Sequence, residues 1–213
     1  MNPLGVLRAA GLGVGLGVVT SMSPAVVNVS IVDAAVAGRR RFAIGLGLGG
    51  GAADAIQAGL AFAGVGRVVL ADPRLVRVLA IAAAVVIAGY AVFAWRRRRA
   101  APAVARAAPA DDAERSARGP LARGAATGFA LTLLNPAVLG AWVAVAAAAW
   151  PGADLVDAAL IAGGVGAGST AWFTLLARWI SRVRRDHPLV AAIPWLSLLL
   201  LIAIAAVGVA RAL

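Results

Sequence analysis

Long apolar stretches alternate with short polar connections along the whole chain. Most of them reach the roughly 20 residues that a helix needs to cross the hydrocarbon core of a bilayer. The pattern therefore predicts six membrane-spanning helices. The expected spans cover residues 11–36, 44–65, 79–95, 124–149, 155–177 and 189–210.

Two of these stretches contain a proline directly after a polar residue, Ser23-Pro24 in the first and Asn135-Pro136 in the fourth. A proline inside a helix removes one backbone hydrogen bond and clashes with the preceding turn. Within a bilayer, the freed carbonyls are tolerated only where they face protein or a watery cavity. We therefore predict that the first and fourth helices are broken at these prolines. Paired interruptions in two halves of a chain are typical of a transporter's substrate site.

The connections between the apolar stretches differ in charge, and this difference predicts the orientation. Arginines gather in the first, third and fifth connections, at residues 39–41, 96–123 and 178–185. The fourth connection has two acidic residues and no arginine. The positive-inside rule therefore places connections one, three and five in the cytoplasm and both termini outside. The second connection, with three arginines and one aspartate, opposes this only weakly.

Residues 100–120 are rich in alanine, proline and charge and show no apolar period, which predicts a flexible cytoplasmic linker. The linker separates a first unit, residues 1–99, from a second, residues 121–213, and each unit has three expected spans. An odd number of spans inserts the second unit upside down relative to the first. The expected fold is an all-α integral membrane protein with six transmembrane helices in two inverted three-helix repeats.

Composition agrees with a membrane protein. Hydrophobic residues make up 62% of the chain and charged residues 14%, against about 25% charged in soluble domains. The net charge of +11 comes from arginines between the spans, so it indicates topology and not nucleic-acid binding. The absence of cysteine excludes disulfides and thiol redox chemistry. A single histidine without clustered ligands predicts no metal site.

Asp54 is the candidate for proton coupling, because it falls near the middle of the second span. An aspartate at the bilayer centre costs about 2.5–3.5 kcal/mol on insertion scales and normally faces the interior of the helix bundle. Burial disfavours its charged form, which suits a group that carries a proton. The alternative is a carboxyl group held by neutral hydrogen bonds that serves packing alone.

Residues near the two interruptions are the candidates for binding a substrate. A broken helix exposes N–H groups and the positive end of its dipole, and both attract a carboxylate. Corresponding positions of the second and fifth helices add further polar side chains, Ser169 matching Asp54. A proline kink used only for packing is the alternative. The predicted substrate-binding residues are Ser23, Pro24, Asn28, Gln57, Asn135, Pro136, Ser169 and Trp172.

Several motifs, taken in order, resemble the lysine exporter (LysE) family and its homoserine/threonine exporter relatives. The resemblance implies a six-helix exporter of amino acids or similar small metabolites in the bacterial cytoplasmic membrane, driven by the proton gradient. The chain departs from the family at Ala25-Val26, where many members continue Ser-Pro with Gly-Pro. The matching motifs are Ser23-Pro24, Gly38-Arg39-Arg40, Asp54 after a glycine-rich run, Asn135-Pro136 and the Gly-Ser-x-x-Trp-Phe of residues 168–173.

The leading hypothesis is a proton-coupled antiporter whose site lies between the two repeats. Its partners would be a small-molecule substrate, protons and the lipid bilayer, with no cofactor and no nucleic acid; a homo-oligomer is compatible with the sequence. An enzyme is not expected, because no nucleophile–base pair or metal cluster is found. Two alternatives stay open. An exporter of inorganic or metal cations would need several acids or histidines in the spans, and a non-transporting membrane scaffold subunit would leave Asp54 dispensable.

Overall fold

A computed structural model describes residues 3–22, 25–65, 118–150 and 152–182, together with isolated positions between 68 and 96 and residue 199. Throughout these residues the regular structure is helical, as expected. Ser23, Pro24, residues 100–117 of the expected linker and nearly all of the sixth expected span lie outside the described residues. The labelled helices are α1 (Pro3–Ser21), α2 (Val26–Val36), α3 (Arg40–Phe62), α8 (Arg118–Leu133), α9 (Pro136–Ala149) and α10 (Leu155–Ile180).

Both predicted interruptions are present. The first apolar stretch forms two helices, α1 ending at Ser21 and α2 beginning at Val26. The fourth also forms two, α8 ending at Leu133 and α9 beginning at Pro136, with a bend of 65° between them. The prediction of broken first and fourth helices is therefore confirmed, although the first helix begins at Pro3, earlier than expected.

Among the described residues, α1 and α10 are long and apolar enough to cross a membrane, and the bent pair α8–α9 is a third such span if it counts as one. At 23 residues α3 has the length of a span. It is not one of the helices that are apolar enough to cross a membrane. It carries six glycines together with Asp54 and Gln57. These helices agree with a helical membrane protein, while the six-span inverted repeat stays a prediction.

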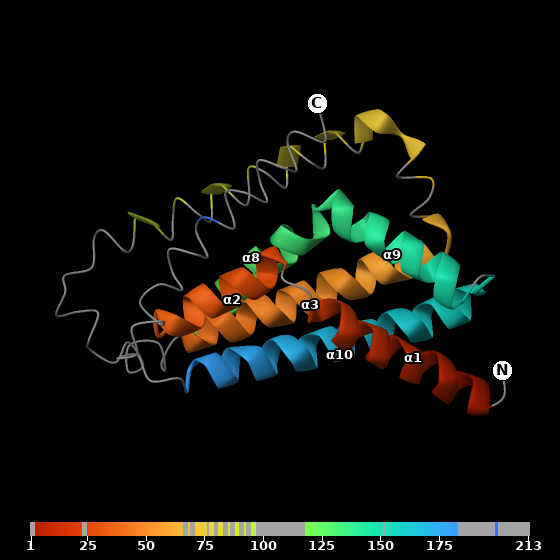
Figure 1. Cartoon of the computed structure of the whole chain (residues 1–213), viewed down its shortest axis with the longest axis horizontal. Helices are drawn as coiled ribbons and strands as arrows, with labels where there is room; N and C mark the ends of the chain where they lie inside the picture. Colours follow the sequence, from red (N-terminus) through yellow and green to blue (C-terminus); the bar gives the residue numbers. More distant parts are fainter. Residues whose placement is uncertain are drawn as a thin grey trace.

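Glycines bring the helix backbones into close contact. Figure 1 shows α3 in the middle of the described helices, with α10 along one side and α2, α8 and α9 along the other. A Cβ atom on Gly49 of α3 would collide with the Ala125 carbonyl of α8, and one on Gly17 of α1 would collide with the Val165 carbonyl of α10. Gly51 of α3 packs equally closely on α10. Small residues at such crossings are what helix packing in lipid requires.

The turn between α2 and α3 contains a buried ion pair. Gly38 has a φ of +77°, the left-handed conformation that ends helices most easily at glycine, and the N–H of Arg39 returns to the Ala34 carbonyl at 2.9 Å. The Arg39 guanidinium then lies 3.5 Å from the Asp33 carboxylate and 4.9 Å from the centre of the Phe42 ring. The pair fixes the connection where the sequence has its first arginine cluster.

Candidate functional site

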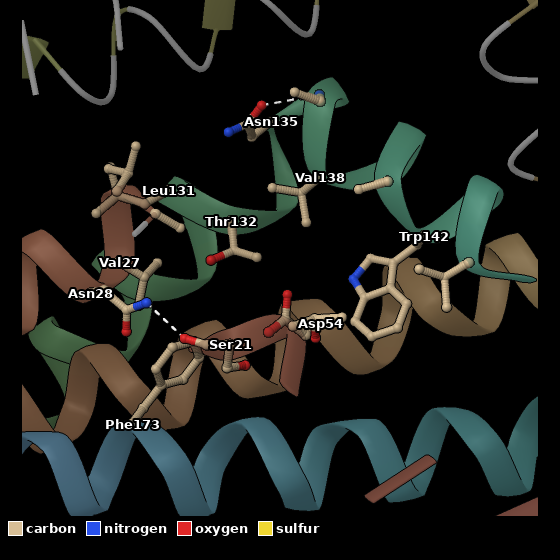
Figure 2. A pocket seen from close by; sticks show the side chains of 16 residues that line it. Ser21, Val27, Asn28, Asp54, Leu131, Thr132, Asn135, Val138, Trp142 and Phe173 are labelled. Atoms are coloured by element: carbon tan, nitrogen blue, oxygen red, sulfur yellow. Dashed lines mark hydrogen bonds between the residues drawn. The ribbon is translucent and has the colours of Figure 1, made fainter. Parts of the chain in front are cut away.

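A cavity of about 330 Å³ lies between the two helix interruptions. Its volume is at the lower end of the roughly 300–1,000 Å³ that is usual for small-molecule sites. The lining is mostly apolar, with a few polar side chains from α1, α2, α3, α8 and the second break (Figure 2). These polar lining residues are Thr20, Ser21, Asn28, Asp54, Thr132 and Asn135.

Asp54 extends from α3 into this cavity, inside the bundle as the sequence predicts (Figure 2). The residue is 7% exposed, and the side chains of Ser169 and Trp142 lie beside its carboxyl group. In the part of the chain that the structure describes, Asp54 takes part in no ion pair. A buried carboxylate is unfavourable without a cation or a proton, so binding either one would stabilise the Asp54 carboxyl group.

Polar side chains satisfy the carbonyl end of α1 at the first break. The Asn28 amide donates to the Ser21 carbonyl at 2.7 Å, and the Ser21 hydroxyl donates to the Ser169 hydroxyl at 2.9 Å. Ser169 in turn donates to the Gly17 carbonyl at 3.3 Å. Ser169 also lies beside the Asp54 carboxyl group, so it stands between that group and the carbonyl end of α1.

The second break is held by a single amide. The Gln57 Nε2 group donates to the carbonyls of Thr132 and Leu133, both at 3.1 Å, and to that of Asn135 at 3.4 Å. The Asn135 Oδ1 atom accepts the N–H of Ala137 at 3.1 Å and so caps α9. Gln57 therefore supports the carbonyl end of α8, while Asn135 supports the start of α9.

The predicted substrate-binding residues divide into four groups. Asn28 and Asn135 line the cavity with Asp54. Ser169 and Gln57 do not line it but hold residues that do, through the hydrogen bonds above. Trp172 is half-buried beside an apolar cluster and does not line the cavity. Pro136, the first residue of α9, does not line it either, while Ser23 and Pro24 fall outside the described residues.

Sequence reasoning missed Trp142, which lines the cavity next to Asp54. Its position seven residues after Asn135 is two helical turns away and therefore on the same face of α9, a spacing that could have identified it. Thr20 and Thr132 were also missed as lining residues. They hold corresponding positions in the two Pro-containing motifs, and this correspondence is a second signal.

A family model described as LysE type translocator matches residues 18–212. The match includes every residue that lines the cavity. No curated protein and no solved structure gives a match to the chain. Among the described residues, no group of three or more His, Cys, Asp and Glu side chains could hold a metal ion.

Proposed function

We propose, because the chain belongs to the LysE-type translocator family, that it exports amino acids or similar small metabolites across the bacterial cytoplasmic membrane. The family is one of membrane transporters and not of enzymes. The observation that carries the proposal is the cavity between the two helix breaks, with the Asp54 carboxyl group directed into it. Interrupted helices around a substrate site are a common construction in secondary transporters.

Asp54 is the proposed coupling group. A buried carboxyl group that has no cation among its neighbours takes up a proton in one state of the cycle and a cationic substrate group in the other. Competition of the two for one carboxylate produces exchange of protons for substrate, which is antiport. Ser169 lies between this carboxyl group and the end of α1, so we expect a change of occupant at Asp54 to reach the first helix break through Ser169.

Helix packing supports a movement of two halves around the cavity. The N-terminal helix α1 packs on α10, and α8, which opens the second half, packs on α3. The first helix of each expected half therefore packs against a helix of the other half. Because glycines line both crossings, the helices are able to slide without side-chain interlocking. The proposed orientation keeps the arginine-rich connections in the cytoplasm.

The test is efflux from cells or proteoliposomes preloaded with a mixture of amino acids, under an imposed pH gradient. Wild type is compared with Asp54→Asn and with the matched control Asp72→Asn, which changes an exposed aspartate outside the cavity. The proposal predicts a specific efflux that Asp72→Asn keeps, that Asp54→Asn loses and that collapse of the gradient abolishes. Equal efflux from wild type and Asp54→Asn would remove Asp54 from the mechanism. No amino-acid efflux from wild type would refute the proposed substrate class.

A further inference from the structure

The two breaks present unlike helix N-termini to the same cavity. At the second break the start of α9 is closed. Pro136 has no N–H, the N–H of Ala137 goes to the Asn135 side chain at 3.1 Å, and that of Val138 goes to the Asn135 carbonyl at 3.1 Å. No free donor is left in this first turn for a ligand.

At the first break the start of α2 is open. Ala25 holds the N-cap position in an extended conformation, with φ −111° and ψ 166°, and its side chain has no acceptor atom. Within the residues that the structure describes, no acceptor reaches the N–H groups of Val26 and Val27. Both residues are only 4% exposed and both line the cavity. Buried N–H groups are rarely left unpaired in proteins, and an acceptor group bound in the cavity would satisfy these two donors.

Asp54 is an independent indication of a ligand in the same cavity. It is more than nine-tenths buried, extends into the cavity and has no cationic partner among the described residues. In Figure 2 Ser21 and Asn28 lie to one side of it and Trp142 to the other. The cavity therefore contains one acidic side chain and one helix start, that of α2, with free N–H groups at its positive end, and no other charged residue lines it.

We infer that the cavity binds a zwitterionic amino acid in a single orientation, with its carboxylate on the first turn of α2 and its ammonium group on Asp54. This assignment rests on the proposed function and adds the orientation and the class of side chain. Leu131, Val138 and Phe173 supply apolar walls, so the side chain that fits is neutral and aliphatic. A lysine side chain would bring a second cation to a cavity with a single lining carboxylate.

The first experiment needs no variant. Binding to the purified full-length protein in lipid nanodiscs is measured by calorimetry for L-leucine, L-leucinamide, 4-methylpentanoate and L-lysine. Leucinamide lacks the carboxylate and 4-methylpentanoate lacks the ammonium group, while both keep the aliphatic chain. Because a hydrogen bond or contact to a charged group contributes about tenfold or more in affinity, each of these two is expected to bind at least about tenfold more weakly than leucine. Lysine is expected to bind more weakly than leucine too.

The second experiment removes one donor from α2. Val26→Pro deletes the N–H at the first helical position, where proline is favoured, and the extended Ala25 suits a residue before proline. Val26→Ala is the matched control, because it shortens the same side chain and keeps the N–H. Leucine should bind about tenfold more weakly to the proline variant than to the alanine variant, whereas leucinamide should bind equally to both. Asp54→Asn should weaken the binding of leucine and leucinamide but not that of 4-methylpentanoate, which has no ammonium group.

The outcomes separate this inference from the proposed function. If wild type binds leucine but leucinamide binds as tightly, or if the two Val26 variants bind leucine equally, the orientation is wrong while the amino-acid site stands. If lysine binds more tightly than leucine, the assignment of the side-chain class is wrong. The same calorimetry is extended to all twenty amino acids. If wild type binds none of them, the proposed amino-acid site fails, and the inference fails with it.

Discussion

Replacing Gln57 by methionine should destabilise the second helix break. The Gln57 side chain is 2% exposed, and its amide is the donor that reaches the carbonyl end of α8. Methionine has a similar length and volume but no N–H group, so the substitution removes the hydrogen bonds and preserves most of the packing. The carbonyls at this end have no continuing helix to satisfy them, because α8 ends at Leu133.

The expected loss of stability depends on which hydrogen bonds each of the three carbonyls keeps in the variant. The Thr132 carbonyl still accepts the N–H of Asn135 at 3.1 Å, and the Asn135 carbonyl still accepts that of Val138 at 3.1 Å. Among the described residues, the Leu133 carbonyl has Gln57 as its one hydrogen-bond donor. Leaving one partly buried carbonyl unpaired and weakening two others costs about 2–3 kcal/mol. For a chain of this size, that loss lowers Tm by about 4–12 °C.

The assay is thermal unfolding of the purified full-length protein in detergent, followed by intrinsic fluorescence. Ile56→Met is the matched control, since Ile56 precedes Gln57 on α3, is 45% exposed and receives the same new side chain. An exposed substitution of this kind should change stability by less than about 0.5 kcal/mol. If Gln57→Met unfolds at the same temperature as Ile56→Met, the amide does not hold the break and the reasoning is refuted.

Two further substitutions test the packing around the site with the same unfolding assay. Gly49→Ala places a Cβ atom against the Ala125 carbonyl and should cost about 1–3 kcal/mol by overpacking. In the control Gly140→Ala, the new Cβ atom meets no atom within 4 Å, so the change should be neutral or stabilising. Equal effects of the two substitutions would contradict the close α3–α8 contact. Arg39→Met removes the buried ion pair between Arg39 and Asp33 and should cost about 3–5 kcal/mol. Arg40→Met, at an exposed position, should cost little. A stable Arg39→Met would show that the ion pair does not hold the turn.

Local chemistry made the helix breaks and the placement of Asp54 predictable from the sequence. A proline breaks a helix wherever it stands in the interior, and an aspartate in a span is directed inward because lipid excludes it. The role of Gln57 was not predictable in this way. Gln57 follows Asp54 by less than one turn, yet its amide reaches the α8 carbonyls and not the cavity. Which side chains reach the cavity depends on how α3, α8 and α9 pack, and that packing joins residues about 75 positions apart.

The two Pro-containing motifs look equivalent in sequence but begin their helices in different registers. In the second, Asn135 is the N-cap and the proline is the first residue of α9. The same register in the first motif would start α2 at position 24, but α2 starts at Val26, two residues later. The shift places Ala25, which cannot cap, before a residue that has a free N–H, at the two positions where the chain departs from the Ser-Pro-Gly-Pro pattern of its family. A zwitterion has one anionic and one cationic end. In the proposed site only one of the two motifs therefore offers free N–H groups, to bind the carboxylate, and the two-residue shift at α2 is what leaves them free.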